Sequence, residues 1–306
     1  MVGAGPAGME CAIVLGKRGF RRVHLVEAEL EIGGIMRWIP RLPGLGEWAR
    51  VLNWRAIQLG KLGNVELVTG ARLGADDVRE YGAELVVLAT GARWSPDGLS
   101  AVTYEPIPGA NASLPHVLTP EQVMLEGKRP PGRRAVVYDC EGYFMAAGLA
   151  EQLALEGLDV ELVTSRPVVA PFCDLTLEGP TLRRRLAELG VRQRAEASLS
   201  SVAPGRVAGA DIFGPFELEA DGVVLVTQRV SNEALYLELA ADRGVLAEAG
   251  IEGLYRAGDC VAPRFIADAI FDGHRLAREV DSEDPSLPLP HLRERFVAEL
   301  PVRART

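Results

Sequence analysis

The sequence lacks the features that mark a dithiol redox protein, a membrane protein or a nucleic-acid-binding protein. Its four cysteines stand far apart and form no C-x-x-C pair, so close spacing builds no redox dithiol, zinc knuckle or iron–sulfur cluster. It has no run of eighteen apolar residues, and its start lacks a basic and then apolar leader. Acidic residues outnumber basic ones, 42 to 33, which disfavours a nucleic-acid partner. We therefore expect a cytoplasmic protein with buried free thiols and neither a membrane nor a nucleic-acid partner.

Histidine and tryptophan are also scarce, with four of each. The histidines share no local spacing with one another or with a nucleophile, which predicts neither a metal site nor a hydrolytic site. The tryptophans are expected to anchor the core or loops. No residue is predicted to be catalytic.

What the sequence does contain is one strand–helix–strand pattern that occurs twice. The chain of 306 residues has room for roughly two domains, and its 33 glycines indicate many tight turns. Apolar residues at helical spacing alternate with short β-branched runs, which is typical of parallel sheets covered by helices. The expected helices are 9–19, 144–157 and 181–191, and the expected strands are 21–27, 83–92, 133–139, 159–165 and 220–230. A further strand, a turn at Gly258 and Asp259 and a long helix are expected within 253–280.

A glycine turn opens the chain, where Gly3, Gly5 and Gly8 enclose Pro6 and Ala7 in the pattern G-x-G-x-x-G. The first glycine permits a tight turn, the second lets the backbone approach a pyrophosphate, and the third lets helix and strand pack closely. Glu27 follows at the end of the next strand, where an acid accepts hydrogen bonds from a ribose. The pattern predicts an adenine nucleotide, ADP or FAD, although a packing turn with a solvated glutamate would look the same.

Only two residues precede this turn, which normally follows a whole buried strand. We expect the first strand to be cut, either because Met1 lies inside a longer reading frame or because a partner chain supplies the rest. The curtailed strand is expected to weaken the first sheet.

Further candidate cofactor contacts follow the other strands of the first repeat. A Gly-Gly pair after Glu27 either forms an ordinary loop or lets the backbone pass near the nucleotide. An aspartate before the last helix either orients the inner phosphate or ribityl part of a flavin or caps the helix. The predicted contacts in this group are Ala28, Gly33, Gly34, Thr90, Gly91, Gly258 and Asp259.

The corresponding turn of the second repeat reads YDCEGYFMAAG and lacks the glycine pattern. Asp139, Glu141, Tyr143 and Phe144 crowd it, and two carboxylates would repel a pyrophosphate. We predict that NAD(P)H does not bind there.

The chain resembles the C-terminal half of trimethylamine dehydrogenase and its dimethylamine and histamine dehydrogenase relatives, over nearly its whole length. A more distant resemblance is to dienoyl-CoA reductase, whose second domain does carry nicotinamide-binding glycines. The stretches that carry the resemblance are GAGPAG, the acid and Gly-Gly pair at 27–34, PGLGEW at 43–48, VLATGARW at 87–94, PIPGANASLP at 106–115, LTPEQVM at 118–124, YFMAAGLAEQLA at 143–154 and GDCVAPRFIADAIFDGHRLAREV at 258–280.

The resemblance implies a part of an amine dehydrogenase that binds ADP rather than complete FAD and passes electrons to an electron-transferring flavoprotein. In this family an FMN-holding barrel and a 4Fe-4S motif lie in a region that this sequence does not contain, so an upstream domain or subunit would have to supply both. Two alternatives remain open: a self-sufficient FAD-dependent oxidoreductase, and a non-catalytic scaffold stabilised by its nucleotide. The sequence leaves the oligomeric state, including a homo-oligomer, undecided.

The fold class expected from these observations is α/β. It comprises two doubly wound, Rossmann-like dinucleotide-binding domains of the flavoprotein disulfide-reductase type, the second inserted into the first. The expected first domain spans 1–118 plus 228–281 and the second spans 119–227. Residues 282–306 are expected to form a C-terminal extension.

Overall fold

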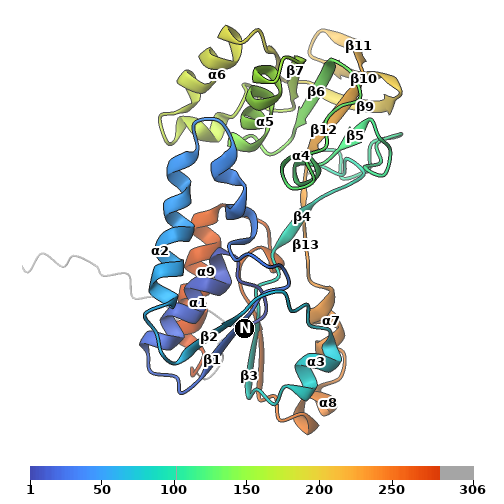
Figure 1. Cartoon of the computed structure of the whole chain (residues 1–306). Helices are drawn as coiled ribbons and strands as arrows, with labels where there is room; N and C mark the ends of the chain where they lie inside the picture. The colour runs from blue at the N-terminus through green and yellow to red at the C-terminus, as the bar shows by residue number, and fades with distance from the viewer. Residues whose placement is uncertain (101, 283–306) are drawn as a thin grey trace, which may run out of the picture.

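The computed structural model describes residues 1–100 and 102–282 (Figure 1). The expected C-terminal extension therefore lies outside the described residues, except for its first residue, Ser282. No helix in the described part of the chain is both long and apolar enough to cross a membrane.

A first unit of the molecule is built on short parallel strands around the chain start. β1 pairs with β2, and β3 pairs with β14. Val2 joins the two pairs, because it forms parallel bridges to both Val26 and Leu88. Val2 thus lies between β1 and β3, at the position of the expected first strand. The strands are β1 (Val23–Val26), β2 (Val65–Val68), β3 (Leu85–Leu88) and β14 (Gly253–Arg256).

Helices lie on both sides of these strands in the first unit (Figure 1). On one side α1, α2 and α9 share an apolar core with β1, and on the other α3, α7 and α8 pack against β3. The close approach of α1 to α9 depends on Gly273, whose absent Cβ would lie 2.1 Å from the Ala7 carbonyl oxygen. The helices are α1 (Pro6–Lys17), α2 (Ala49–Leu59), α3 (Ala75–Glu80), α7 (Ala234–Ala240), α8 (Arg243–Glu248) and α9 (Ile266–Glu279), with short 3-10 turns η1 (Gly34–Arg37), η2 (Ile39–Arg41), η3 (Gly46–Trp48) and η5 (Gly258–Cys260).

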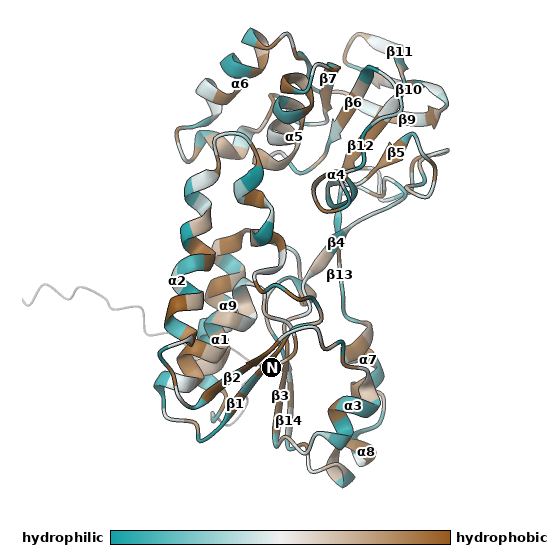
Figure 2. Ribbon diagram, in the orientation of Figure 1, coloured by the Kyte–Doolittle hydropathy of each residue, from teal (hydrophilic) through white to brown (hydrophobic). Residues whose placement is uncertain are grey.

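The second unit contains a five-stranded parallel sheet in the order β5-β12-β6-β7-β8. Its central strands β6 and β12 are buried along nearly their whole length, as expected for a parallel sheet covered on both faces. Figure 2 shows this hydrophobic colouring on β6 and β12 and hydrophilic residues on the outer turns of α6. The elements are β5 (Val117–Leu118), α4 (Pro120–Met124), β6 (Arg134–Asp139), α5 (Phe144–Leu155), β7 (Asp159–Thr164), η4 (Pro171–Asp174), α6 (Gly179–Glu188), β8 (Arg192–Arg194) and β12 (Gly222–Val226).

The two faces of this sheet are covered differently. α5 and α6 cover one face, whereas a three-stranded antiparallel sheet covers the other through a separate core. Its strands are β9 (Ser198–Ala203), β10 (Gly205–Asp211) and β11 (Gly214–Ala220). A doubly wound sheet would carry helices on both faces, so the expected fold class is wrong for this unit.

An antiparallel pair of strands connects the two units (Figure 1). These strands are β4 (Ala92–Trp94) and β13 (Arg229–Ser231). The predicted single strand over 220–230 is therefore two strands, because β12 ends at Val226 inside the second unit. The predicted helices over 9–19, 144–157 and 181–191 are confirmed as α1, α5 and α6, with ends shifted by a few residues.

Candidate functional site

A cavity of about 840 Å³ lies where the two units and their connecting strands meet. It is lined from the first unit by α1, η1 and η5, from the connection by β4 and β13, and from the second unit by α4 and the start of α5. Nine of the predicted cofactor contacts line it: Gly3, Gly5, Pro6, Ala7, Glu27, Gly34, Thr90, Gly91 and Asp259. The other four predicted residues, Gly8, Ala28, Gly33 and Gly258, do not line it.

The three glycines of the first turn differ in their surroundings. Gly3 has a φ of +102°, and a Cβ there would lie 2.4 Å from the Ala89 carbonyl oxygen. A Cβ on Gly8 would lie 1.9 Å from the Gly3 carbonyl oxygen, so only glycine lets α1 start this close to the turn. Gly5 has no atom within 4 Å of its absent Cβ and faces the cavity. Two glycines therefore shape the turn, and the third leaves space for a ligand.

The start of α1 faces this space without a side-chain cap. A helix N-terminus carries backbone N–H groups and the positive end of the helix dipole, which favour an anion. The turn thus has both the room and the electrostatic character that a phosphate group requires.

Glu27 stands directly after β1 at the edge of the cavity. Its carboxylate accepts hydrogen bonds from the Ala4 N–H at 2.7 Å and the Glu29 N–H at 3.0 Å. These bonds fix the carboxylate beside the glycine turn, and each of its oxygens has a further lone pair. It can therefore accept a hydrogen bond from a ligand hydroxyl group.

Gly33 and Gly34 contact the glycine turn at Ala4 and Gly5. The Gly33 N–H donates to the Ala4 carbonyl oxygen at 2.8 Å, and Gly33 has a φ of +115°. A Cβ on Gly34 would lie 3.3 Å from the Gly5 Cα. Gly33 and Gly34 therefore pack against the glycine turn, but only Gly34 reaches the cavity.

Asp259 belongs to a charged cluster that joins both units. The Arg229 guanidinium lies 2.8 Å from the Asp259 carboxylate and 3.4 Å from that of Glu141, which follows β6 of the second unit. Burial raises the pKa of Glu141 to about 7, while Arg229 opposes the shift. Burial also raises the pKa of Asp259, again against Arg229. One cation thus holds two partly desolvated carboxylates at the junction of the units.

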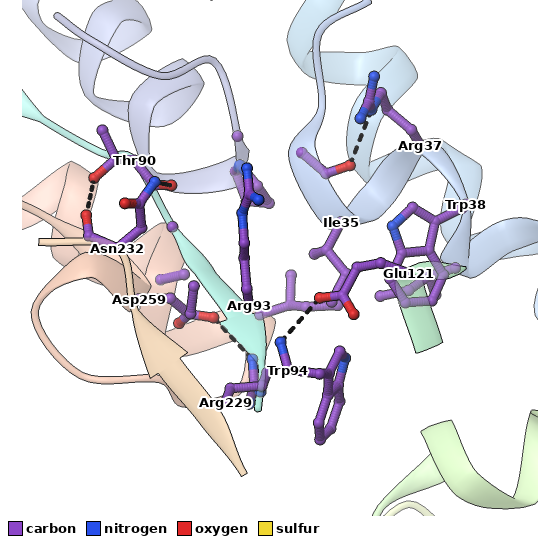
Figure 3. Close-up of a pocket in the computed structure, with 18 of the residues that line it drawn as sticks. Ile35, Arg37, Trp38, Thr90, Arg93, Trp94, Glu121, Arg229, Asn232 and Asp259 are labelled. Atoms are coloured by element: carbon purple, nitrogen blue, oxygen red, sulfur yellow. Dashed lines mark hydrogen bonds and ion pairs between the residues drawn. The ribbon is translucent and has the colours of Figure 1, made fainter. Parts of the chain in front are cut away.

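The structure brings further residues to the cavity that sequence patterns did not predict as a site. Figure 3 shows Arg93, Arg229, Asn232 and Glu121 around it, and Trp38 and Trp94 contribute its apolar wall. The two tryptophans are buried, as expected of core anchors. The arginines come from short connecting strands, and the periodicity of such short strands carries no signal for a site. The Thr90 hydroxyl donates to the Asn232 backbone carbonyl at 2.5 Å and so links β13 to the end of β3.

The second turn is filled by its own side chains. The Asp139 carboxylate accepts hydrogen bonds from the N–H groups of Glu141 at 3.0 Å and Gly142 at 2.9 Å. The rings of Tyr143 and Phe144 meet edge to face with 4.6 Å between centroids, and both line the cavity. The crowding predicted for this turn is confirmed, while the predicted failure to bind NAD(P)H stays a prediction.

The four cysteines are free and buried, as expected. Within residues 1–100 and 102–282 no group of three or more His, Cys, Asp or Glu side chains is placed to hold a metal ion.

Comparison with known proteins shows that the chain is similar to part of several amine dehydrogenases. The chain is 43% identical to dimethylamine dehydrogenase of Hyphomicrobium sp. (strain x) over 319 residues, which cover 96% of this chain and 43% of that protein. The structure of histamine dehydrogenase from Rhizobium sp. 4-9 matches with a TM-score of 0.88 and 36% identity, covering 92% of this chain and 44% of that one. The chain is homologous to the dimethylamine and histamine dehydrogenases.

Residues 118–232 match the family described as the OYE-like second alpha/beta domain. A multifunctional alkene reductase/demethylase OYE from Caballeronia cordobensis is 30% identical, over 90% of this chain and 42% of that protein. The chain spans less than half the length of each of these relatives.

These findings correct the expected fold class. The match to histamine dehydrogenase, with a TM-score of 0.88, is much closer than the match to the flavoprotein disulfide reductase RclA of Escherichia coli, with a TM-score of 0.57 and 18% identity. The second unit matches an OYE-like domain and not a dinucleotide-binding one. The fold class is therefore that of the OYE-like amine dehydrogenases, and not of paired disulfide-reductase Rossmann domains.

The expected function and cofactor are corrected too. The chain matches an OYE-like domain, an OYE and two amine dehydrogenases, and the description of this chain as an ADP- or FAD-binding electron-transfer part separate from an FMN barrel is not supported. The expectation of ADP or FAD as the cofactor is likewise not supported. The physical reason for the error is that a glycine turn on a helix N-terminus recognises a phosphate and does not identify the rest of the cofactor.

Proposed function

We propose that this chain acts in a flavin-dependent oxidoreductase of the amine dehydrogenase class and that its cavity binds a phosphate-bearing, hydroxyl-rich cofactor, with FMN as the first candidate. The observation that carries the proposal is the open position at Gly5 beside the uncapped start of α1 and the fixed carboxylate of Glu27. The phosphate would lie at the turn, and the hydroxyl groups would donate to Glu27.

Within this proposal the thirteen predicted cofactor residues divide into three groups. The nine that line the cavity would contact the cofactor. Gly8, Gly33 and Gly258 would act through packing, since a Cβ on Gly258 would lie 2.7 Å from the Ala7 Cβ. Ala28 would act only through its neighbour Glu27.

The two units would serve as separate domains, 1–118 plus 228–281 and 119–227. The strand pairing supports this division, because the first sheet draws on both ends of the chain and the second on its middle. We also propose that the chain corresponds to the C-terminal half of its amine dehydrogenase relatives. An electron-transferring flavoprotein as redox partner and a cytoplasmic location stay predictions.

The test is to denature the purified protein and identify the released ligand by mass spectrometry and absorbance. The proposal expects one phosphate-bearing, hydroxyl-rich ligand per chain, with the flavin spectrum of FMN. Release of no such ligand, together with failure to bind added FMN, would overturn it.

A further inference from the structure

Four arginines line the cavity, and three of them are engaged within the described structure. Arg229 pairs with Asp259 and Glu141, and Arg264 pairs with Asp272. The Nε of Arg37 donates to the Gly34 carbonyl oxygen at 3.4 Å, within its own turn. Each of these guanidinium groups therefore has part of its hydrogen-bonding capacity satisfied by the protein.

Arg93 differs, because no hydrogen bond or ion pair joins its guanidinium group to any residue that the structure describes. It lies in the middle of β4, opposite Val230 of β13. Alternation along the strand directs Arg93 away from the buried Trp94, and Figure 3 shows it extended in the cavity. Its side chain is exposed there.

The carboxylate that could engage Arg93 is otherwise occupied. Glu121 accepts a hydrogen bond from the Trp94 N–H at 3.0 Å and makes no ion pair with Arg93. Burial raises the pKa of Glu121, and the nearby charge of Arg93 offsets only part of that rise. Among the described residues, Arg93 is thus a cation with no hydrogen-bonded or ion-paired side-chain partner, in a cavity that also contains the uncapped start of α1.

We infer that Arg93 is an anion-binding residue that contacts the phosphate of the cofactor. The inference rests on the proposed function and adds a specific contact from the connecting strand. A planar guanidinium with five donors matches phosphate oxygens in a bidentate geometry, which lysine cannot reproduce. Together with the helix N-terminus it would surround the phosphate from two elements, so that the cavity selects a phosphorylated ligand over its dephosphorylated counterpart.

The test compares the affinities of FMN and riboflavin, which differ only by the phosphate, for the ligand-free wild type, Arg93→Gln and Arg93→Lys. Inorganic pyrophosphate serves as a third probe, because it reports the anion site alone. Arg41→Gln is the matched control, since Arg41 is exposed outside the cavity and makes no ion pair among the described residues. Thermal melting without ligand checks that each variant folds.

We expect Arg93→Gln to weaken the binding of FMN and of pyrophosphate by roughly tenfold to a hundredfold, as for the loss of one charged hydrogen-bonding partner. The affinity for riboflavin should change less than about twofold. The FMN affinity of Arg93→Lys should lie between those of wild type and Arg93→Gln. Equal FMN and pyrophosphate affinities in wild type and Arg93→Gln, or an equal loss for FMN and riboflavin, would overturn the inference. If wild type binds pyrophosphate through Arg93 but does not bind FMN, the flavin proposal fails and the inference stands. Wild type that binds neither probe overturns both.

Discussion

The molecule contains two strand–turn–helix segments with the same local fold and opposite surroundings. When Pro6 at the start of α1 is aligned with Phe144 at the start of α5, Gly3 corresponds to Glu141, Gly5 to Tyr143 and Gly8 to Ala146. The first turn has an open position at Gly5. The second has a tyrosine there, and a phenylalanine where the first has proline.

The difference shows that the backbone alone does not make an anion site. In the second turn the Asp139 carboxyl group accepts hydrogen bonds from the N–H groups of Glu141 and Gly142, and the Tyr143 and Phe144 rings stand in front of α5. Neither α1 nor α5 has a side-chain cap, so the two turns differ in the side chains that fill the space in front of the helix. The identity of a few turn residues therefore decides whether the same fold binds a phosphate or fills the position itself.

The largest expected effect comes from adding a side chain at Gly8, where α1 lies closest to the first turn. Gly8→Ala places a methyl group 1.9 Å from the Gly3 carbonyl oxygen, so the strand and helix must separate. We expect a loss of about 3 kcal/mol in the free energy of unfolding, measured by denaturant titration. The control Ala146→Gly, at the aligned position of α5, should cost only about 1 kcal/mol. Equal costs would show that the two turns pack alike.

The next prediction concerns a variant in which the first turn carries the side chain found at the aligned position of the second turn. Gly5→Tyr introduces the residue that stands at the aligned position, into space with no atom within 4 Å of the absent Cβ. Because the side chain would occupy the phosphate position, we expect FMN affinity to fall by about 100-fold or more. The melting temperature of the ligand-free protein should change little. Unchanged FMN affinity in this variant would place the ligand elsewhere.

A smaller effect is expected at the carboxylate beside the first turn. Glu27→Gln keeps an oxygen that can accept the Ala4 N–H and removes the charge that accepts a ligand hydroxyl. We expect FMN affinity to fall about tenfold, the equivalent of one charged hydrogen bond. Glu66→Gln, at an exposed acid on the neighbouring strand, is the control and should bind as wild type does. A similar fall in both variants would indicate a general charge effect and no specific contact.

The last prediction concerns the pH dependence of stability at the second turn. Since the folded-state pKa of Glu141 is raised to about 7, the folded protein binds this proton more tightly than the unfolded chain, and stability is lost as the pH rises from about 4.5 through about 7. Glu141→Gln cannot ionise. We expect its melting temperature, relative to wild type, to rise between about pH 5 and about pH 8. Parallel plots of melting temperature against pH for the two proteins would contradict the raised pKa of Glu141.

Much of this comparison could be predicted from the sequence, because glycine spacing and apolar periodicity are local signals. α1, β1, β6, α5 and β7 lie close to their predicted positions, and nine of the predicted contacts meet in one cavity. Arg93 and Arg229 could not be predicted as site residues, because strands of three residues are too short for a pattern and the pairing of β4 with β13 is long-range. The three antiparallel strands that cover the second unit were missed because they contain no continuous apolar run. Along β11, for example, exposed residues alternate with less exposed ones. The cofactor was misassigned because the turn recognises only the phosphate.

The central claim is that the first turn, and not the second, binds a phosphate-bearing cofactor. The most direct measurement is the organic phosphate released per chain after reconstitution with FMN and removal of unbound ligand, for wild type, Gly5→Tyr and Tyr143→Ala. The account predicts one phosphate per chain for wild type and Tyr143→Ala and none for a folded Gly5→Tyr. Retention of one phosphate per chain by Gly5→Tyr, or its loss only in Tyr143→Ala, would contradict it.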